Sequence, residues 1–488
     1  MASDAPWLQL HPGTLAVNLL PRVWGSVRAF WPLLLAFLYG RGSVEVWSNL
    51  FFLALFTAIP VYATAVHYAT LRYRVSEGRL EVRSGLLNRQ LRVIAPERIQ
   101  NMEMVRNVFH RVTGLVEVRI ETASGREVEG LLSALSVEAA QDLMARLGRV
   151  RREPTGEAPR PLAGIGLMQL AQYGATTGRL GAIGLAVAFG FELIDTGDPE
   201  QMAQLSRTLG VLGGSAALLA LVTGAFLFGI LGSVARHYGF TLVQEEDVLV
   251  TQEGLFTKRR VELPVEKVQL VTVHESWIRR LLGFGSVHIE TAAAGEGRGG
   301  VDQAEAVIPV VPSDRIWTLV SEAVPALSVD VDRLELLPPH PRALLRMYRQ
   351  ALGQVVFAVA VLVWWQGLWG LLGIGLVVPA LVVARKDWEH QGYRISGDWV
   401  VARRGWLTRT TQVLDLRKLQ SSAVAQGPLL RLWGLGQLSV RVAGNGVTLP
   451  TLSWQDVRRL QATLEPAEAS PALGHSEALQ SDIQPHGV

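Results

Sequence analysis

Three long segments of this chain carry the same residue pattern, and this repetition constrains the fold more than any other feature of the sequence. With Gly85, Gly254 and Gly405 superposed, the copies run without a gap to residues 122, 291 and 442. Repetition on this scale indicates one structural unit built three times. The columns identical in all copies hold Gly85, Gly254 and Gly405; Gln100, Gln269 and Gln420; Arg111, Arg280 and Arg431; and Gly114, Gly283 and Gly434.

Each copy has the pattern of antiparallel strands closed by a helix. Residues 73–83 alternate in polarity around Gly78, which predicts a hairpin. We expect the glycine that opens each copy to need a positive φ, and the later shared glycine to cap a short helix. An amphipathic helix that begins at a serine is predicted to close each copy. These closing helices are expected at residues 136–150, 313–324 and 453–464.

Long stretches without charge separate the copies. Residues 46–66 are 21 in number and suffice to cross a hydrocarbon layer of about 30 Å. A shorter apolar segment at 29–39 precedes them, and residues 180–194 and 209–234 form a second block. Residues 352–384 are too many for one span and fit two spans folded at 366–370. Buried core helices are the alternative, but three such blocks favour three transmembrane hairpins.

Basic residues flank the apolar blocks, whereas the short loops inside the blocks hold few of them. The positive-inside rule therefore predicts a multi-pass plasma-membrane protein with both termini and all large segments in the cytoplasm. Its 488 residues include no cysteine, which excludes disulfides and thiolate metal sites. No cleaved signal peptide is expected in the first 22 residues.

The motif of the first copy resembles the bacterial pleckstrin-homology-like (PH-like) domain. Its residues are Gly85-Leu86, Arg89, Pro96-Glu97-Arg98-Ile99-Gln100, Arg111, Gly114-Leu115 and Val118-Arg119-Ile120-Glu121-Thr122. The order of hairpin and then domain, three times over, resembles the YdbS/YdbT-like membrane proteins across nearly all of residues 1–466. The resemblance implies a partly open barrel capped by a helix, and it leaves the activity open because fold does not fix function.

The third copy departs from this pattern. Trp406 replaces the leucine, no proline precedes Gln420, and Arg441-Val442 replace the Glu-Thr pair. A specialised role for this copy is one interpretation. The predicted domains are 1–66, an interfacial helix with the first hairpin; 67–150, the first module; 151–177, a linker; 178–235, the second hairpin; 236–326, the second module; 327–384, a juxtamembrane helix with the third hairpin; 385–466, the third module; and 467–488, a disordered tail.

Clustered basic residues beside the opening glycines are the candidate lipid-headgroup contacts. Each Lys or Arg held near an anionic leaflet contributes about 1 kcal/mol to membrane binding. The alternative is a solvated basic face that only satisfies the positive-inside bias. The candidates are Arg89, Arg92, Lys258, Arg259, Arg260, Arg403, Arg404 and Arg409.

The shared arginines and glutamines are interpreted as structural. Arg111 and Arg280 lie between apolar residues, and we expect each to pair with a carboxylate of its own module, such as Glu121 or Glu290. The third copy has no acid at 441, so any such pairing of Arg431 must differ. The glutamines are expected to be buried hydrogen-bonding side chains.

Signatures of other functions are missing from the sequence. The ten histidines lack metal-ligand spacing, the glycine run at 295–300 is not followed by a helix, and no aromatic residues interleave with the basic runs. We therefore predict a non-enzymatic envelope scaffold or sensor with no catalytic residue, metal, cofactor or nucleic acid. Its partners would be membrane lipids, another membrane protein or a second copy. The alternative is a component of a transport, export or stress-resistance system, with Glu192 and Gln366 as candidate polar groups.

Overall fold

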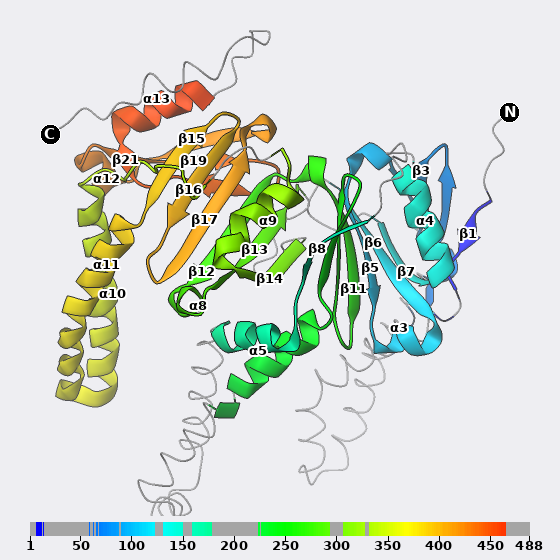
Figure 1. Cartoon of the computed structure of the whole chain (residues 1–488), viewed down its shortest axis with the longest axis horizontal. Helices are drawn as coiled ribbons and strands as arrows, with labels where there is room; N and C mark the ends of the chain where they lie inside the picture. The colour runs from blue at the N-terminus through cyan, green and yellow to red at the C-terminus, as the bar shows by residue number, and fades with distance from the viewer. Residues whose placement is uncertain are drawn as a thin grey trace, which may run out of the picture. The chain divides into compact units, whose positions relative to one another are not determined.

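The computed structural model of the chain is shown in Figure 1. It separates into two compact units, residues 1–160 with 245–264 and residues 161–244 with 265–488. The predicted domain limits follow the repeats, and the two units follow spatial contact; each unit is described by itself. The structure describes residues 6–11, 13, 58, 62, 65–66, 68–86, 89–122, 130–149, 159–177, 223–224, 226–292, 306–326 and 331–464.

The first unit begins with an antiparallel sheet in the order β1-β2-β3-β4. Its strands are β1 (Leu8–Gln9), β2 (Arg72–Ser76), β3 (Arg79–Ser84) and β4 (Gln90–Ile94). The predicted hairpin is present, and Gly78 occupies its turn with φ of 75°. Strand β1 precedes the first apolar block in sequence and was not expected, because two residues carry no alternation that a pattern could reveal.

The second half of the first copy forms three more strands. These are β5 (Ile99–Arg106), β6 (Leu115–Thr122) and β7 (Gly130–Ser136). Helix α3 (Val108–Thr113) joins β5 to β6 and ends at Gly114 in the left-handed region. Helix α4 (Val137–Arg149) closes the copy, with the Ser136 hydroxyl accepting from the Ala139 amide at 3.1 Å. Apolar residues of both sheets and of α4 form one core.

Strands of two copies share one sheet in the first unit. Strand β5 of the first copy pairs with β11 (Lys258–Pro264) of the second, and β11 pairs with β10 (Val248–Glu253). The order is β7-β6-β5-β11-β10 (Figure 1). The copies are therefore not separate modules joined by linkers.

The second unit repeats this arrangement with the next pair of copies. Strands β12 (Leu270–Ser276), β13 (Phe284–Glu290) and β14 (Ala306–Pro312) belong to the second copy. They continue through β12 and β17 into the third copy, giving the order β14-β13-β12-β17-β16-β15. The third-copy strands are β15 (Gly392–Ser396), β16 (Trp399–Arg404) and β17 (Thr408–Asp415).

Helices and short strands complete the second copy within this unit. Strand β8 (Arg160–Gly164) lies beside β9 (Thr241–Glu245), and α5 (Leu167–Thr176) follows β8. Helix α8 (Trp277–Leu281) joins β12 to β13. The predicted closing helix begins as a 3-10 turn at Ser313–Arg315 and continues as α9 (Ile316–Ala323).

The third copy is complete within the second unit and has the expected PH-like arrangement. A second sheet holds β18 (Ser421–Ala425), β19 (Leu435–Arg441), β20 (Gly446–Thr448) and β21 (Leu452–Ser453). The short helix α12 (Pro428–Leu432) and the closing helix α13 (Trp454–Leu464) complete it. Residues of both sheets and Val457, Leu460 and Leu464 of α13 form its core.

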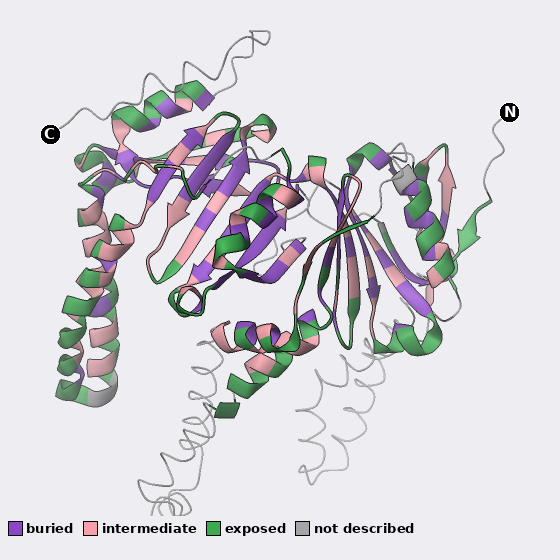
Figure 2. Cartoon of the chain, viewed as in Figure 1, coloured by how far each residue is buried: buried purple, intermediate pink, exposed green. Residues whose placement is uncertain are grey.

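The predicted third hairpin consists of two apolar helices that pack together. Helix α10 (Ala343–Gln366) ends at Gly367, where φ is 62°, and a 3-10 segment η5 (Gly367–Leu376) leads into α11 (Val377–Glu389). The chain thus turns within the predicted 366–370. Ala343–Trp364 and Gly367–Glu389 are the two spans found among the described residues, and about 22 residues of helix extend about 33 Å. Figure 2 shows this pair largely exposed, whereas the sheets are buried.

The expected fold class is thus confirmed in part, as PH-like sheets with two apolar helices long enough to span a membrane. Nearly all of the predicted first hairpin and most of the second lie outside the described residues, and an apolar helix over Phe226–His237 is the main described part of the second. The loop at 295–300 and the tail after 464 also lie outside the described part of the chain.

Candidate functional site: the junctions between copies and the base of the hairpin

The two junctions between copies have the same strand register. Lys258 lies opposite Arg106 where β11 pairs with β5, and Arg409 lies opposite Glu275 where β17 pairs with β12. The alignment of the repeats puts Arg106 in one column with Glu275, and Lys258 in one column with Arg409. The chain therefore uses one junction geometry twice, with different side chains.

The shared arginines fix these junctions. The Arg111 guanidinium donates to the Leu255 carbonyl at 3.1 Å, and that of Arg280 donates to the Trp406 carbonyl. Leu255 and Trp406 each directly follow the opening glycine of the next copy. The expected pairing with Glu121 or Glu290 is therefore wrong. An acidic residue is the partner that a sequence suggests for an arginine, but a guanidinium also donates to a turn carbonyl that has no strand partner.

Within the described ranges, ion pairs engage three of the eight headgroup candidates. Arg259 pairs with Glu103 across the first junction, and Arg409 forms two 2.8 Å bonds to Glu275 across the second. Arg260 lies 3.1 Å from Glu262. The two junction carboxylates are buried, with side chains 7 and 8 % exposed, so these arginines balance charges that would otherwise be costly to bury.

The remaining candidates differ in their surroundings. Arg89 and Lys258 are exposed, and Arg92 is exposed with its guanidinium 3.4 Å from Gln90 Oε1. Arg403 donates to Thr411 Oγ1 at 3.3 Å. Arg404 is partly buried and lines a pocket. The basic residues thus do not form one surface, and the structure divides them between the junctions, the solvent and this pocket.

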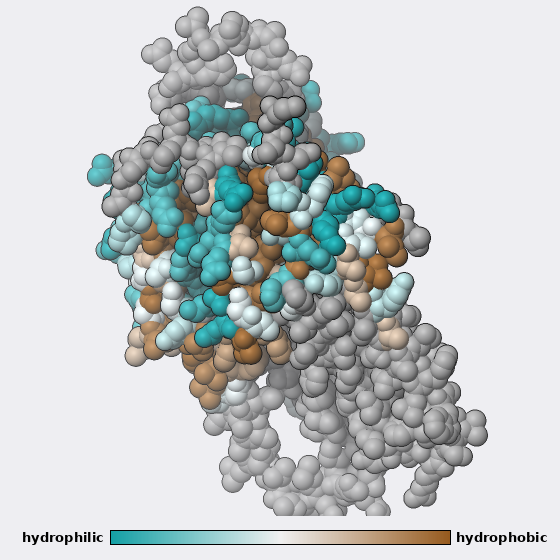
Figure 3. All heavy atoms as spheres, turned by 90° about the vertical axis from the view of Figure 1, so that its right-hand side faces the viewer, coloured by the Kyte–Doolittle hydropathy of each residue, from teal (hydrophilic) through white to brown (hydrophobic). Residues whose placement is uncertain are grey.

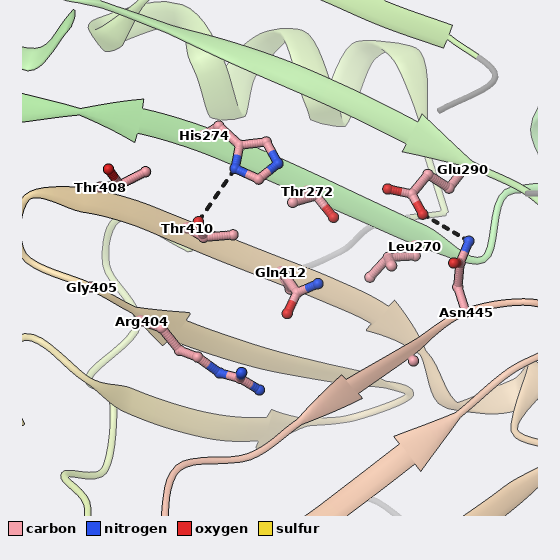
Figure 4. Close-up of a pocket in the computed structure, with 11 residues that line it drawn as sticks. Leu270, Thr272, His274, Glu290, Arg404, Gly405, Thr408, Thr410, Gln412 and Asn445 are labelled. Atoms are coloured by element: carbon pink, nitrogen blue, oxygen red, sulfur yellow. Dashed lines mark hydrogen bonds between the residues drawn. The ribbon is translucent and has the colours of Figure 1, made fainter. Parts of the chain in front are cut away.

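The pocket lies along the second junction and has a volume of about 370 Å³. Figure 4 shows Glu290 and Asn445 at one end, joined by a 2.7 Å bond from Asn445 Nδ2 to Glu290 Oε2. His274 and Thr410 lie at the other end, 3.3 Å apart. The lining residues are Leu270, Thr272, His274, Glu290, Arg404, Gly405, Thr408, Thr410, Gln412, Asn445 and Gly446.

Burial shifts the ionisation of the pocket residues toward their neutral forms. It raises the pKa of the Glu290 carboxyl to about 7 and lowers the pKa of the His274 imidazole, which Arg279 lowers further. It also lowers the pKa of the Arg404 guanidinium. No hydrogen bond or ion pair of the Arg404 side chain occurs among the described residues, so this guanidinium is the donor best placed for an anionic group.

The base of the hairpin carries an apolar rim. The Trp406 amide donates to Asp387 of α11 at 2.6 Å, and Arg342, just before α10, donates to the Trp433 carbonyl at 3.4 Å. The β16–β17 turn and the end of α12 are thereby held against the hairpin. Their neighbour α8 is joined to the same turn by the bond from Trp277 N to Leu407 O. The exposed apolar residues of this rim are Trp277, Leu281, Leu282, Leu407, Leu429 and Leu432.

Equivalent elements of the first unit are also apolar at their tips. Val108, Phe109 and Val112 of α3 are exposed, as are Leu255 and Phe256 in the β10–β11 turn. Figure 3 shows apolar residues gathered toward the lower margin of this unit, the side on which α3 lies in Figure 1. These tips were not among the predicted site residues, which were chosen by charge alone. The recurrence of apolar residues beside Arg111, Arg280 and Arg431 was the available signal.

The shared glycines have the conformation that the sequence predicts. φ is 94° at Gly85, 108° at Gly254 and 80° at Gly405. A Cβ at Gly254 would lie 1.9 Å from the Thr257 carbonyl oxygen, so the turn excludes any side chain. Gly114, Gly283 and Gly434 take φ between 67° and 74° after the short helices. Gly254 and Gly405 thus shape the two turns whose carbonyls accept from Arg111 and Arg280 of the preceding copies.

The three shared glutamines differ in burial. Gln100 is buried, Gln269 is partly buried and Gln420 is exposed. Gln100 is therefore buried as expected, whereas Gln420 is not. No group of His, Asp and Glu suited to a metal ion occurs in the described ranges.

Comparison with known proteins agrees with this architecture. The chain belongs to the bacterial PH domain family, whose model matches residues 23–151, 187–321 and 344–468. It is also similar to the UPF0699 transmembrane protein YdbT of Bacillus subtilis (strain 168), with 22% identity over 446 residues that cover 86% of this chain and 89% of that protein. The word transmembrane in that name agrees with the two apolar helices. No solved structure matches the chain.

Proposed function

We propose that this protein is a non-enzymatic scaffold of the plasma membrane, built from PH-like modules fused edge to edge on the cytoplasmic side. The observation that supports this most is the same junction register at β5–β11 and at β12–β17. Sharing a sheet couples neighbouring modules through main-chain hydrogen bonds and removes exposed strand edges. Within each unit, such a junction would hold the surfaces of two neighbouring copies at a fixed spacing, which is what a scaffold needs.

Anchoring rests on the described hairpin. Few residues of its helices are buried within the protein, with 6 and 11 % of the two span windows buried. A bilayer would cover that surface. Arg342, Arg346 and Arg349 precede the apolar run, and Arg385 and Lys386 follow it, so the positive-inside rule puts the modules in the cytoplasm.

Lipid contact in this proposal uses the apolar rim and Arg404. The rim includes the β16–β17 turn and the end of α12, which contact the hairpin base, so its Trp and Leu side chains would enter the interfacial layer where such residues are favoured. Arg404 lies in the pocket whose lining includes Gly405 and Thr408 of the same turn, within reach of a headgroup phosphate. We propose a structural role and no lipid contact for Arg259, Arg260 and Arg409, because their guanidinium groups already form ion pairs with carboxylates.

Spin labels on the full chain in liposomes test the proposal, because each cysteine introduced into this cysteine-free protein is unique. The pair Leu281→Cys and Ala462→Cys spans the second and third copies, and the control pair Leu432→Cys and Ala462→Cys lies within the third. If the second and third copies form one rigid body, the distances between the two labels should be equally narrowly distributed in both pairs. A broad distribution for the first pair alone would refute the fused scaffold.

The same labels report on lipid contact and orientation. Labels at Leu281 and Leu432 should be relaxed by oxygen in the lipid more than by a water-soluble nickel chelate, and the label at Ala462 should show the reverse. The cysteine at Ala462 should also resist impermeant thiol reagents added to intact cells. If the labels at both rim positions were exposed to water, the rim would not contact lipid, and the proposed scaffold role would be unaffected.

A further inference from the structure

Two sheet edges end the series of junctions. Strand β4 ends the first sheet, and β18 ends the last one. By the alignment of the repeats, β4 is the first-copy counterpart of β11 and β17, and β18 is the third-copy counterpart of β5 and β12. Each internal junction therefore joins one strand of the β4 type to one of the β18 type. In the described part of the chain, β4 and β18 each have one edge without a strand partner.

Burial distinguishes these two strands from their counterparts. Residues 99–105 of β5 and 270–275 of β12 are almost all buried, whereas the five residues of β18 are exposed or partly exposed. Leu91 of β4 is 60 % exposed, and its counterpart Thr411 of β17 is 1 % exposed. The difference arises because a neighbouring strand covers β5, β12 and β17.

Neither edge carries the usual protection against strand pairing. Strand β18 reads Ser-Ser-Ala-Val-Ala, with small uncharged residues and no proline. Strand β4 exposes Leu91 and Val93 and has Arg92 as its one charge. Soluble sheet edges are commonly blocked by lysine, proline or a bulge, and their absence here favours a strand partner.

The junction arginine supports the same conclusion. Arg111 and Arg280 each donate to the carbonyl that follows the next opening glycine. Arg431 occupies the same column and is exposed, and its guanidinium has no hydrogen bond among the described residues. The corresponding acceptor in the repeats is the carbonyl of Leu86, which follows Gly85.

We propose that copies of this chain join head to tail, with β18 of one copy pairing antiparallel with β4 of the next. The occupant of each edge is thus a second copy, and its register is that of the internal junctions. Arg431 would donate to the Leu86 carbonyl of the neighbour. The expected pairs are Ser421 with Ile94, Ser422 with Val93, Ala423 with Arg92, Val424 with Leu91, and Ala425 with Gln90.

Such an interface joins two different surfaces, so it generates rings or open filaments rather than a symmetric dimer. Anchored by hairpins, the assembly would lie in the plane of the membrane. The inference rests on the proposed scaffold, but the two can fail separately. The spin-label distances test coupling inside one chain, and the experiment below tests coupling between chains.

Disulfide trapping of the full chain in its native membrane tests the assembly. The double variant Leu91→Cys with Val424→Cys should give a ladder of covalent oligomers on mild oxidation. Co-expression of the two single variants should give dimers and nothing larger, and neither single variant alone should crosslink. The off-register control, Leu91→Cys with Ser421→Cys, should give about tenfold less product, since disulfides require matched Cα positions.

Several results would overturn the proposal. They are equal yields from the in-register and off-register pairs, a disulfide closed within one chain, or efficient dimers from a single variant. A second measurement avoids reliance on the cysteine pair. Arg431→Ala should reduce the ladder several-fold, whereas Arg459→Ala, at an exposed arginine of α13, should not. Equal ladders in both backgrounds would rule out the arginine contact between copies.

Discussion

At the scale of single residues, position in the junction decides what a side chain does. Arg259 and Arg409 belong to basic clusters that look alike in sequence to Lys258 and Arg89, yet they are held by buried carboxylates. The sequence shows which residues are basic. It does not show which of them face a carboxylate from another copy, because that carboxylate is more than 130 residues away along the chain.

Glu290 should make stability depend on pH. Its pKa is raised by burial from 4.5 to about 7. Between these values the folded protein keeps a proton that the unfolded chain has released, so stability falls as pH rises through this window and levels off above it. Each unit of difference in pKa corresponds to about 1.4 kcal/mol. Glu290→Gln should therefore remove this part of the dependence of the unfolding free energy on pH.

Denaturant unfolding of the full chain in detergent, from pH 5 to 8 in steps of about half a unit, measures this effect. His274 contributes a slope of opposite sign, since its lowered pKa costs stability as pH falls. The relevant quantity is therefore the difference between wild type and Glu290→Gln. If the difference in unfolding free energy between wild type and Glu290→Gln did not change with pH, Glu290 would not have a raised pKa.

At the scale of elements, glycines set how closely the hairpin helices approach. A Cβ at Gly370 would lie 2.3 Å from the Leu362 carbonyl carbon and from the Val363 nitrogen. These are backbone atoms, so no rotamer change can relieve the contact. Gly375, in the same segment η5, has no neighbour within 4 Å of an added Cβ. The close approach of the α10 and η5 backbones thus requires glycine at position 370.

Gly370→Ala should destabilise the hairpin by about 1–3 kcal/mol, because overpacking displaces the backbone. Gly375→Ala, the matched control, should be nearly neutral. Thermal unfolding in detergent, followed by tryptophan fluorescence, provides the comparison, since Trp364, Trp365 and Trp369 lie at this end of the hairpin. Equal losses from both substitutions would mean that the close approach at Gly370 does not stabilise the hairpin.

At the scale of the whole molecule, shared sheets replace linkers between copies. Each internal junction combines strand pairing, an arginine bond to a turn carbonyl and an ion pair with a buried carboxylate. Cutting the chain at repeat boundaries would therefore remove one of the two neighbouring strands from each of β5, β11, β12 and β17. Isolated single modules are poor material for binding experiments on this protein.

Breaking the Arg409–Glu275 pair should destabilise the second junction. Arg409→Ala leaves Glu275 buried without its counter-charge and should cost about 3 kcal/mol. The double variant Arg409→Met with Glu275→Leu removes both charges and should cost much less. Lys386→Ala removes one member of an exposed pair with Glu389 and should cost under about 1 kcal/mol. Denaturant unfolding of all three variants in detergent measures these losses of unfolding free energy. Equal losses for Arg409→Ala and Lys386→Ala would contradict a stabilising role of the junction ion pair.

The sequence by itself determined the triplication, the strand and helix order of each copy, the turn glycines and the course of the third hairpin. These features depend on local periodicity, chain length without charge, and φ values that only glycine adopts readily. Only the tertiary structure decided that the copies share sheets, that Arg111 and Arg280 contact the next copy, and that a polar pocket lies between the second and third copies. Strand pairing between distant segments uses main-chain groups that every residue carries, so no side-chain pattern records it.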